Sequence, residues 1–144
     1  MAKVGIPDDD DYLYRGNTIV IRAMHRRNGA MPAKEWLNGL EARFKARFLA
    51  AARAIETSER IGRPAGRITK LKMSKQGLSE IHITNRGSSA PHLRAFGCWE
   101  GRDRDGINTL WIASGVSKKS NKLRSRDIDN ADAIADEWRE AREQ

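Results

Sequence analysis

The sequence predicts a single α+β domain. Apolar residues recur at helical spacing over residues 33–57, and a second stripe of this kind follows residue 127. Between them, four short segments rich in β-branched and aromatic residues follow one another over residues 67–116, separated by turn-forming sequences. Because short consecutive strands with tight connections usually pair antiparallel, we expect an antiparallel sheet with the helices packed on one face.

The N-terminal part combines an acidic segment with a predicted strand. Four consecutive aspartates lie within residues 1–16, and we expect this stretch to be flexible. Residues 17–144 are expected to form the single folded domain. Its first strand is NTIVIRAM, residues 17–24, which is rich in β-branched side chains. Asn28 and Gly29 then mark a turn.

Residues 33–57 predict helical structure that is interrupted once. The apolar positions are Trp36, Leu37, Leu40, Phe44, Phe48, Ala51, Ala52 and Ile55. Asn38 and Gly39 fall inside this stripe, where glycine is unfavourable, and we expect them to split it into a helical hairpin. Pro32 suits the first turn of the first helix.

Four later strands and a C-terminal helix complete the predicted fold. The strands are RITKLKM (67–73), LSEIHIT (78–84), HLRAFGCW (92–99) and NTLWIASGV (108–116). Asp127 is a suitable N-cap, so we expect the last helix to begin there. Its apolar stripe consists of Ile128, Ala131, Ile134, Ala135 and Trp138.

Composition excludes several classes of protein. No apolar run approaches the ~18–20 residues that span a bilayer, and the N-terminus lacks the apolar core of a secretory signal. We therefore expect a cytoplasmic protein with no membrane partner. Cys98 is the one cysteine, which excludes an internal disulfide and favours a small core residue. The three histidines lack metal-ligand spacing, and glycine-rich phosphate-binding motifs are absent, so we expect no metal and no cofactor.

Positive charge is concentrated in one predicted loop. The net charge of +8 divides into +13 for residues 1–126 and −5 for residues 127–144, and a basic body favours a polyanionic partner. The run SKKSNKLRSR, residues 117–126, is tethered between the last strand and the last helix, so its cations can line a phosphodiester path. A loop that only aids solubility is the alternative, and charge alone does not distinguish RNA, DNA and an acidic protein.

Several segments occur in an order typical of one toxin superfamily. They are AKEWLNGLEARFKARFLAAARAI, GRP with ITKLK, GLSEIHI, LRAF and GVSKKSNKLRSRDIDNADAIADEW. Over residues 33–138 the chain resembles the HigB-like, phage-related branch of the RelE/ParE toxin superfamily. The resemblance implies a RelE-like fold, with a helical pair packed across a compact sheet, and ribosome-dependent endoribonuclease activity on mRNA. It also implies that a partner antitoxin holds the protein inactive. We expect this antitoxin to bind through an acidic or helical segment, and a small helix-turn-helix protein is one candidate.

The resemblance, together with the basic loop, supplies the candidate site residues. The candidate catalytic residues are Glu80, His82, Arg94 and Lys119. The candidate RNA-binding residues are Arg86, His92, Lys118, Lys122, Arg124 and Arg126. Such a site requires that Arg94 and His82 share a concave surface with the lysines of the loop.

The expected reaction begins with attack of the ribose 2′-OH on the adjacent phosphate, which needs a base, a proton donor and positive charge. Glu80 and His82 alternate along one strand, so both side chains lie on one face, which we expect to be opposite the core. They are candidates for base and proton shuttle, and Arg94 is a candidate to hold a phosphate. The alternatives are a solvated strand face for Glu80 and His82, a surface position for His92, and an ion pair of Arg94 with Glu80 or Glu100.

Two other functions stay open. A non-catalytic protein of the same fold would bind nucleic acid or an acidic partner. Ser79 and Leu93 favour this non-catalytic hypothesis, because they occupy positions where the family has aromatic residues that stack on bases. A sister branch of the superfamily poisons DNA gyrase, so gyrase inhibition is the third hypothesis.

Overall fold

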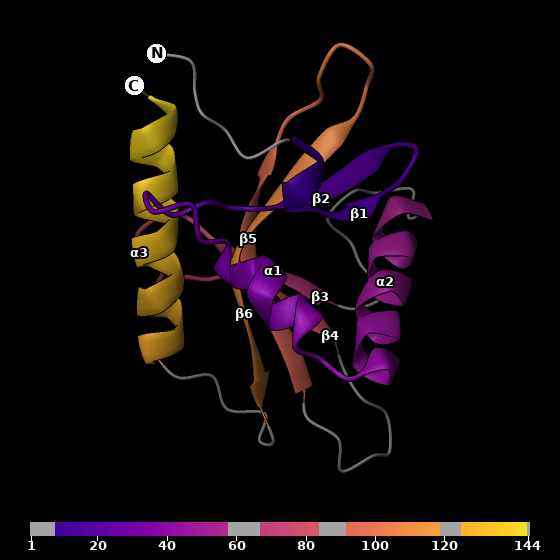
Figure 1. The fold of residues 1–144 in the computed structure, drawn as a ribbon, viewed down its shortest axis with the longest axis horizontal. Coiled ribbons are helices and arrows are strands. Elements are labelled where there is room, and N and C mark those ends of the chain that lie inside the picture. Colours follow the sequence, from indigo (N-terminus) through magenta and orange to yellow (C-terminus); the bar gives the residue numbers. More distant parts are fainter. Residues whose placement is uncertain (1–7, 58–66, 84–91, 119–124, 144) are drawn as a thin grey trace.

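The described part of the chain forms one six-stranded sheet with helices on both faces (Figure 1). The computed structural model describes residues 8–57, 67–83, 92–118 and 125–143. The elements are η1 (Asp8–Asp11), β1 (Tyr12–Arg15), β2 (Ile19–Ala23), α1 (Pro32–Asn38), α2 (Ala42–Thr57), β3 (Arg67–Lys70), β4 (Ser79–Ile83), β5 (His92–Glu100), β6 (Asn108–Lys118) and α3 (Ser125–Arg142). The strands lie in the order β1-β2-β6-β5-β4-β3. The predicted α+β class is confirmed.

Residues 8–15 belong to the fold, although they lie within the segment 1–16 that was expected to be flexible. Strand β1 pairs antiparallel with β2. Asp11, the last residue of the aspartate run, is only 3% exposed. The sequence did not predict that these residues are ordered, because a block of like charges such as the aspartate run is typical of disordered chain.

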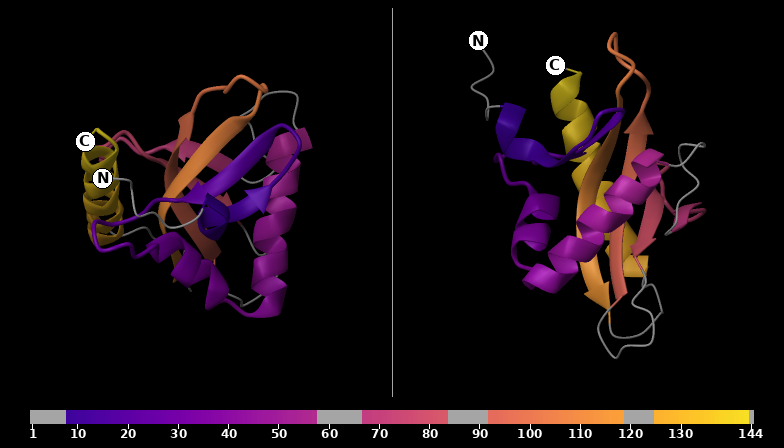
Figure 2. Two further views of the ribbon diagram at one scale, coloured as in Figure 1. Left: turned by 45° about the horizontal axis from the view of Figure 1, so that its top comes forward. Right: turned by 90° about the vertical axis from the view of Figure 1, so that its right-hand side faces the viewer.

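The sheet is mixed, so the expectation of a purely antiparallel sheet is wrong. Strand β2 pairs in parallel with β6, with Ile19 opposite Asn108 and Ala23 opposite Ile112. The other neighbouring pairs of described strands are antiparallel. The chain passes through both helices of the hairpin after β2, and a long connection of this kind permits parallel pairing. Figure 2 shows the two N-terminal strands lying beside β6.

The helical hairpin forms as predicted: α1 ends at Asn38, and residues 39–41 separate it from α2. Helix α1 begins at Pro32, and at its end the amide of Gly39 donates a hydrogen bond to the carbonyl of Glu35. The buried residues of α2 are Phe44, Phe48, Ala52 and Ile55. They pack with α1 on one face of the sheet.

Helix α3 covers the opposite face, which corrects the expectation that the helices lie on one face. The core beneath the hairpin contains Ile81 and Ile83, whereas the core beneath α3 contains Leu78, Phe96 and Trp138. This division explains the irregular alternation in LSEIHIT, because Leu78 points toward α3 and the two isoleucines point toward the hairpin. A sheet with both faces covered has no bare polar side.

Helix α3 begins at Ser125, so the prediction that Asp127 is its N-cap is wrong. Asp127 lies in the first turn, where a carboxylate suits the positive end of the helix. Its Oδ2 lies 2.6 Å from Nζ of Lys118. This ion pair joins the end of β6 to the start of α3.

Candidate functional site

The structure describes only part of the predicted site. Arg86, Lys119, Lys122 and Arg124 lie outside the described residues. The basic loop is thus described only at its two ends, where Arg126 is exposed on the first turn of α3. The other candidates are Glu80, His82, His92, Arg94 and Lys118.

Strand register brings these candidates to one face of the sheet. His82 lies opposite Arg94 on the neighbouring strand, and His92 lies opposite Lys118. Directly paired residues of antiparallel strands point to the same face, as do alternate residues along a strand. Lys118 therefore shares a face with Arg94 and His82, as the predicted site requires. That face is the one on which α3 packs; Arg94 is buried there, whereas His82 and His92 are half-buried.

Glu80 and Arg94 form a buried ion pair. Nη1 of Arg94 lies 2.5 Å from Oε2 of Glu80, and the two residues are 5% and 8% exposed, respectively. Glu80 pairs in register with Phe96, a core residue beneath α3. The expectation that the carboxylate of Glu80 lies on a face opposite the core is therefore wrong. The ion pair between Arg94 and Glu80 is one of the alternatives that the sequence left open.

His82, His92, Lys118 and Asp127 form a second polar group, here termed the histidine cluster. Nε2 of His82 lies 3.3 Å from Nδ1 of His92, with ring centroids 5.3 Å apart and planes inclined by 43°. Both rings are half-buried. The side chains of Lys118 and Asp127 are 17% and 12% exposed. The cluster lies where β4 and β6 end and β5 begins, and it combines two imidazoles with a paired ammonium group.

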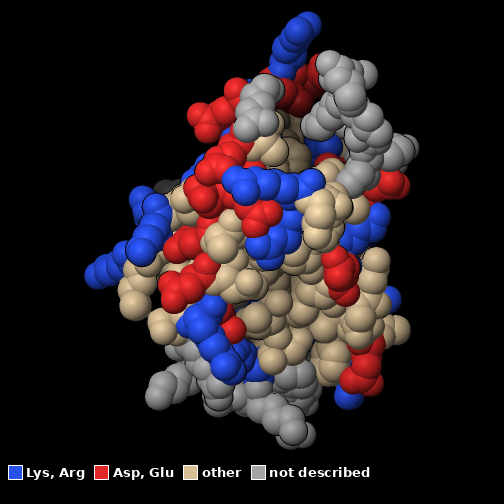
Figure 3. Space-filling view, turned by 60° about the vertical axis from the view of Figure 1, so that its left-hand side comes forward, with Lys and Arg blue, Asp and Glu red and all other residues tan. Residues whose placement is uncertain are grey.

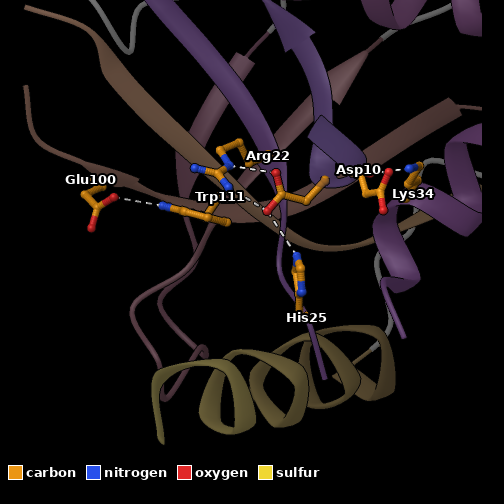
Figure 4. Close-up of polar contacts among 7 residues, drawn as sticks. Asp10, Arg22, His25, Lys34, Glu100 and Trp111 are labelled. Carbon is orange, nitrogen blue, oxygen red and sulfur yellow. Dashed lines mark hydrogen bonds and ion pairs between the residues drawn. The ribbon is translucent and has the colours of Figure 1, made fainter. Parts of the chain in front are cut away.

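A third polar group surrounds Asp11 and was not predicted (Figure 4). Arg22 binds both carboxylate oxygens of Asp11, at 2.7 Å through Nε and 2.8 Å through Nη2. Nε2 of His25 lies 3.0 Å from Oδ2 of the same carboxylate. The guanidinium of Arg22 also lies 4.7 Å from the ring centroid of Trp111. In the sequence, Arg22 could have indicated this group, because a charged residue inside an apolar strand needs a partner.

A pocket of about 420 Å³ lies between the β5–β6 hairpin and the end of α3, and is here termed the tryptophan pocket. Trp111 and Trp138 lie side by side in its wall, with ring centroids 4.9 Å apart. The guanidinium of Arg142 lies 4.6 Å from the ring of Trp138. The lining residues are Cys98, Trp99, Glu100, Trp111, Trp138, Arg139, Arg142 and Glu143. The sequence interpretation missed this pocket because it treated Trp138 and Cys98 only as core residues.

Hydrogen bonds and burial set the ionisation of two pocket residues. Partial burial alone would raise the pKa of Glu100, but hydrogen bonds from Trp111, at 3.1 Å, and Arg142, at 2.7 Å, outweigh it and lower that pKa. Burial raises the pKa of the Cys98 thiol, although Arg139, 3.6 Å from the sulfur, acts in the opposite direction. Cys98 is therefore a protonated, weakly reactive thiol near neutral pH.

The acidic C-terminal segment pairs with basic residues of the same chain. Arg26 binds Glu137, and Arg27 binds Glu140, so α3 is tied to the connection between β2 and α1. The hydrogen bond from Arg26 lowers the pKa of Glu137. Figure 3 shows acidic and basic side chains interleaved on this side of the molecule. Part of the positive charge that predicted a polyanionic partner is thus neutralised within the chain.

Comparisons with protein-family models, curated proteins and solved structures find no match to this chain. Within the described residues, no helix has the length and apolar character needed to cross a membrane. The same residues hold no group of three or more His, Cys, Asp or Glu side chains placed to bind a metal ion. Function is therefore inferred from the residues and their geometry.

Proposed function

We propose that the protein is a RelE/HigB-like toxin that cleaves mRNA on the ribosome, with the histidine cluster as its reaction centre. One observation supports this best: His82 and His92, from adjacent strands, lie within hydrogen-bond reach of each other, and His92 is directly opposite Lys118. Two imidazoles and a cation can supply the base, the proton donor and the positive charge that cleavage by the ribose 2′-OH requires.

The two histidines divide the proton transfers between them. The pair acts with one ring as the neutral imidazole, which has a lone pair to accept a proton, and the other as the imidazolium, which has a proton to give. One ring removes the proton of the 2′-OH as the bond from that oxygen to phosphorus forms. The other ring gives a proton to the 5′-oxygen as its bond to phosphorus breaks. The products are a 2′,3′-cyclic phosphate and a 5′-hydroxyl, and this route needs no metal.

Lys118 supplies positive charge beside the imidazoles. Its ammonium group is paired with Asp127, so an RNA phosphate has to compete with that carboxylate for Lys118. Lys119 and Lys122, which continue the basic loop, are predicted to extend the phosphate path.

Glu80 and Arg94 act as positioning residues in this proposal. Their buried ion pair holds β4 against β5, and Arg94 lies opposite His82 in the register of those strands. Substrate does not touch them in this scheme, so their loss is expected to act through stability and through the placement of His82.

Mapping of mRNA 5′ ends after incubation with programmed ribosomes tests the proposal. We expect cleavage by the wild-type chain and a loss of ~10²–10⁴-fold in rate for His82→Gln and for His92→Gln, the size typical of a missing acid or base. The matched control is His25→Gln, because Gln can still donate a hydrogen bond to Asp11 and position 25 lies outside the histidine cluster, in the connection between β2 and α1. No cleavage by the wild-type chain, or equal rates for all three variants, would exclude the histidine cluster.

A non-catalytic RNA-binding protein is the second candidate. The burial of Glu80 and Arg94 favours it, because a carboxylate and a guanidinium expected to act on RNA are engaged with each other. RNA binding that weakens steeply with salt, with no product formed on ribosomes, would select this function.

The toxin proposal also predicts a cellular effect. Expression should arrest growth, and an inhibitory partner encoded nearby should relieve the arrest. A ribosomal substrate implies that the protein acts in the cytoplasm. Continued growth at confirmed expression of the intact chain would contradict the proposal.

A further inference from the structure

The tryptophan pocket is separate from the histidine cluster. Cys98, in the pocket, and His92, in the cluster, lie six residues apart on β5. At 3.3–3.4 Å per residue, this separation is about 20 Å. Nothing in the proposed cleavage reaction uses the pocket, so its construction needs an explanation of its own.

The walls of the pocket are fixed by specific contacts. Trp111 donates its Nε1 hydrogen to Glu100 and lies against Trp138, and each tryptophan is 7% exposed. Arg139 donates to the backbone carbonyl of Gln76 at 2.8 Å and to its side-chain oxygen at 2.6 Å. These contacts hold the indoles and one guanidinium in place before any ligand enters, which favours binding.

Arg142 is the adjustable charge at the rim. Its guanidinium lies over the rings of Trp111 and Trp138, at 5.3 and 4.6 Å from their centroids. Its ion pair with Glu100 is accessible to water, since the two side chains are 42% and 46% exposed. An exposed pair of this kind contributes little to stability, so an incoming phosphate can replace Glu100 as the partner of Arg142.

We infer that the tryptophan pocket binds one nucleotide unit, an unpaired base with its phosphate. Its volume of about 420 Å³ falls within the range of small-molecule sites. The exposed guanidinium of Arg142 lies over the two buried indole rings, and an arginine plane held in this way is a surface on which an unpaired base stacks. The carboxylates of Glu100 and Glu143 can accept hydrogen bonds from the amino groups of a base, while Arg142 holds the phosphate. The inference rests on the proposed function only in naming RNA, rather than a free nucleotide, as the source of this unit.

Two signals of the full-length chain report occupancy of the pocket. Trp99, Trp111 and Trp138 line it, so a bound base should change tryptophan fluorescence. Cys98 is the only cysteine of the sequence, so alkylation of the protein by N-ethylmaleimide reports this position alone. We expect adenosine 5′-monophosphate to quench the fluorescence and to slow the alkylation of Cys98 over the same concentration range.

Control ligands and variants make the test specific. Ribose 5-phosphate, which lacks the base, and adenosine, which lacks the phosphate, should each bind at least about tenfold more weakly, because each loses one of the two anchors. Arg142→Gln should weaken binding of adenosine 5′-monophosphate by a similar factor. Arg102→Gln removes the same charge from an exposed position outside the pocket lining, and should leave binding unchanged.

Each outcome decides the inference. The absence of both quenching and protection at millimolar adenosine 5′-monophosphate overturns it, as does an equal effect of Arg142→Gln and Arg102→Gln. Protection by a short adenosine oligoribonucleotide as well as by the mononucleotide supports RNA as the source, whereas protection by the mononucleotide alone supports a free nucleotide. Failure of ribosomal cleavage with retained protection of Cys98 removes the proposed function and leaves the pocket intact.

Discussion

Nη1 of Arg94 lies 2.5 Å from Oε2 of Glu80, across β5 and β4 and beneath α3. Both residues were candidates for the reaction centre, and an ion pair was the alternative left open for Arg94. In the structure, both side chains are buried, and the charge of each compensates the charge of the other.

Removal of one partner should therefore destabilise the protein strongly. We expect Arg94→Met to lower the free energy of unfolding by about 3–5 kcal/mol, because it leaves the buried carboxylate of Glu80 without its cation. Glu80→Gln should lower it as well, because it removes a negative charge that compensates the buried guanidinium. The double variant should lose much less than the sum of the two. Urea denaturation of the four proteins measures the coupling. The control is the ion pair of Arg43 and Glu41, whose side chains are 68% and 67% exposed. The same set of variants at that pair should show almost no coupling energy.

Gly115 is required by the packing of α1 on β6. A Cβ at this position would overlap the indole ring of Trp36. We expect Gly115→Ala to lower the free energy of unfolding by about 1–3 kcal/mol, as overpacked sites do. Gly101→Ala should change it by less than about 0.5 kcal/mol, since no atom lies within 4 Å of the added Cβ. Equal unfolding midpoints for the two variants would show that α1 shifts freely away from the sheet.

Glu56 should make stability depend on acid pH. Burial alone would raise the pKa of Glu56, but the hydroxyl of Tyr14, at 2.6 Å, and the amide of Thr18, at 2.7 Å, outweigh it and lower that pKa below its ordinary value of 4.5. A lowered pKa in the folded state stabilises the protein above the unfolded-state pKa, and this contribution is lost as pH falls through the folded-state value.

The variant that tests this contribution is Glu56→Gln. Its free energy of unfolding should fall less steeply than that of the wild-type chain as pH drops below about 4.5. Tyr14→Phe removes one donor and should give an intermediate slope, which separates loss of ionisation from loss of packing. Identical pH profiles for wild type and Glu56→Gln would rule out the contribution.

Cys98 should react slowly with alkylating reagents. Burial raises the pKa of its thiol, and the thiolate is the reactive form. The rate of alkylation by iodoacetamide should therefore increase at higher pH in the native protein than in the protein unfolded in urea. Coincident pH–rate profiles in the two states would mean that Cys98 is open to solvent.

The local elements and the antiparallel pairing of the consecutive strands β3 to β6 could be predicted from the sequence, whereas the place of β2 in the sheet could not. The stripe from Trp36 to Ile55 predicts the helical hairpin correctly, because helical periodicity depends only on near neighbours. The parallel partnership of Ile19 with Asn108 depends on residues far apart in the chain, which no local pattern encodes. The short strand β1 was not predicted, because the charge of the aspartates before it indicated a flexible segment.

In the candidate site, too, local features could be predicted from the sequence and tertiary contacts could not. Alternation along β4 correctly predicts that Glu80 and His82 share a face. Which face α3 covers is a tertiary property, so the burial of Glu80 and Arg94 could not be predicted from the pattern. The approach of Trp138 to Trp111 joins a strand to a helix and could not be anticipated from the spacing of either residue.

The central position of β6 has a consequence for biosynthesis. Residues 19–23 emerge from the ribosome early, but their parallel partners at 108–112 are made about 90 residues later. Until then the inner edge of β2 presents unpaired amide and carbonyl groups, which can recruit strands from other chains. Contacts so distant in sequence also slow folding. We expect a nascent chain that stops before residue 108 to depend on chaperones, and completion of β6 to release it.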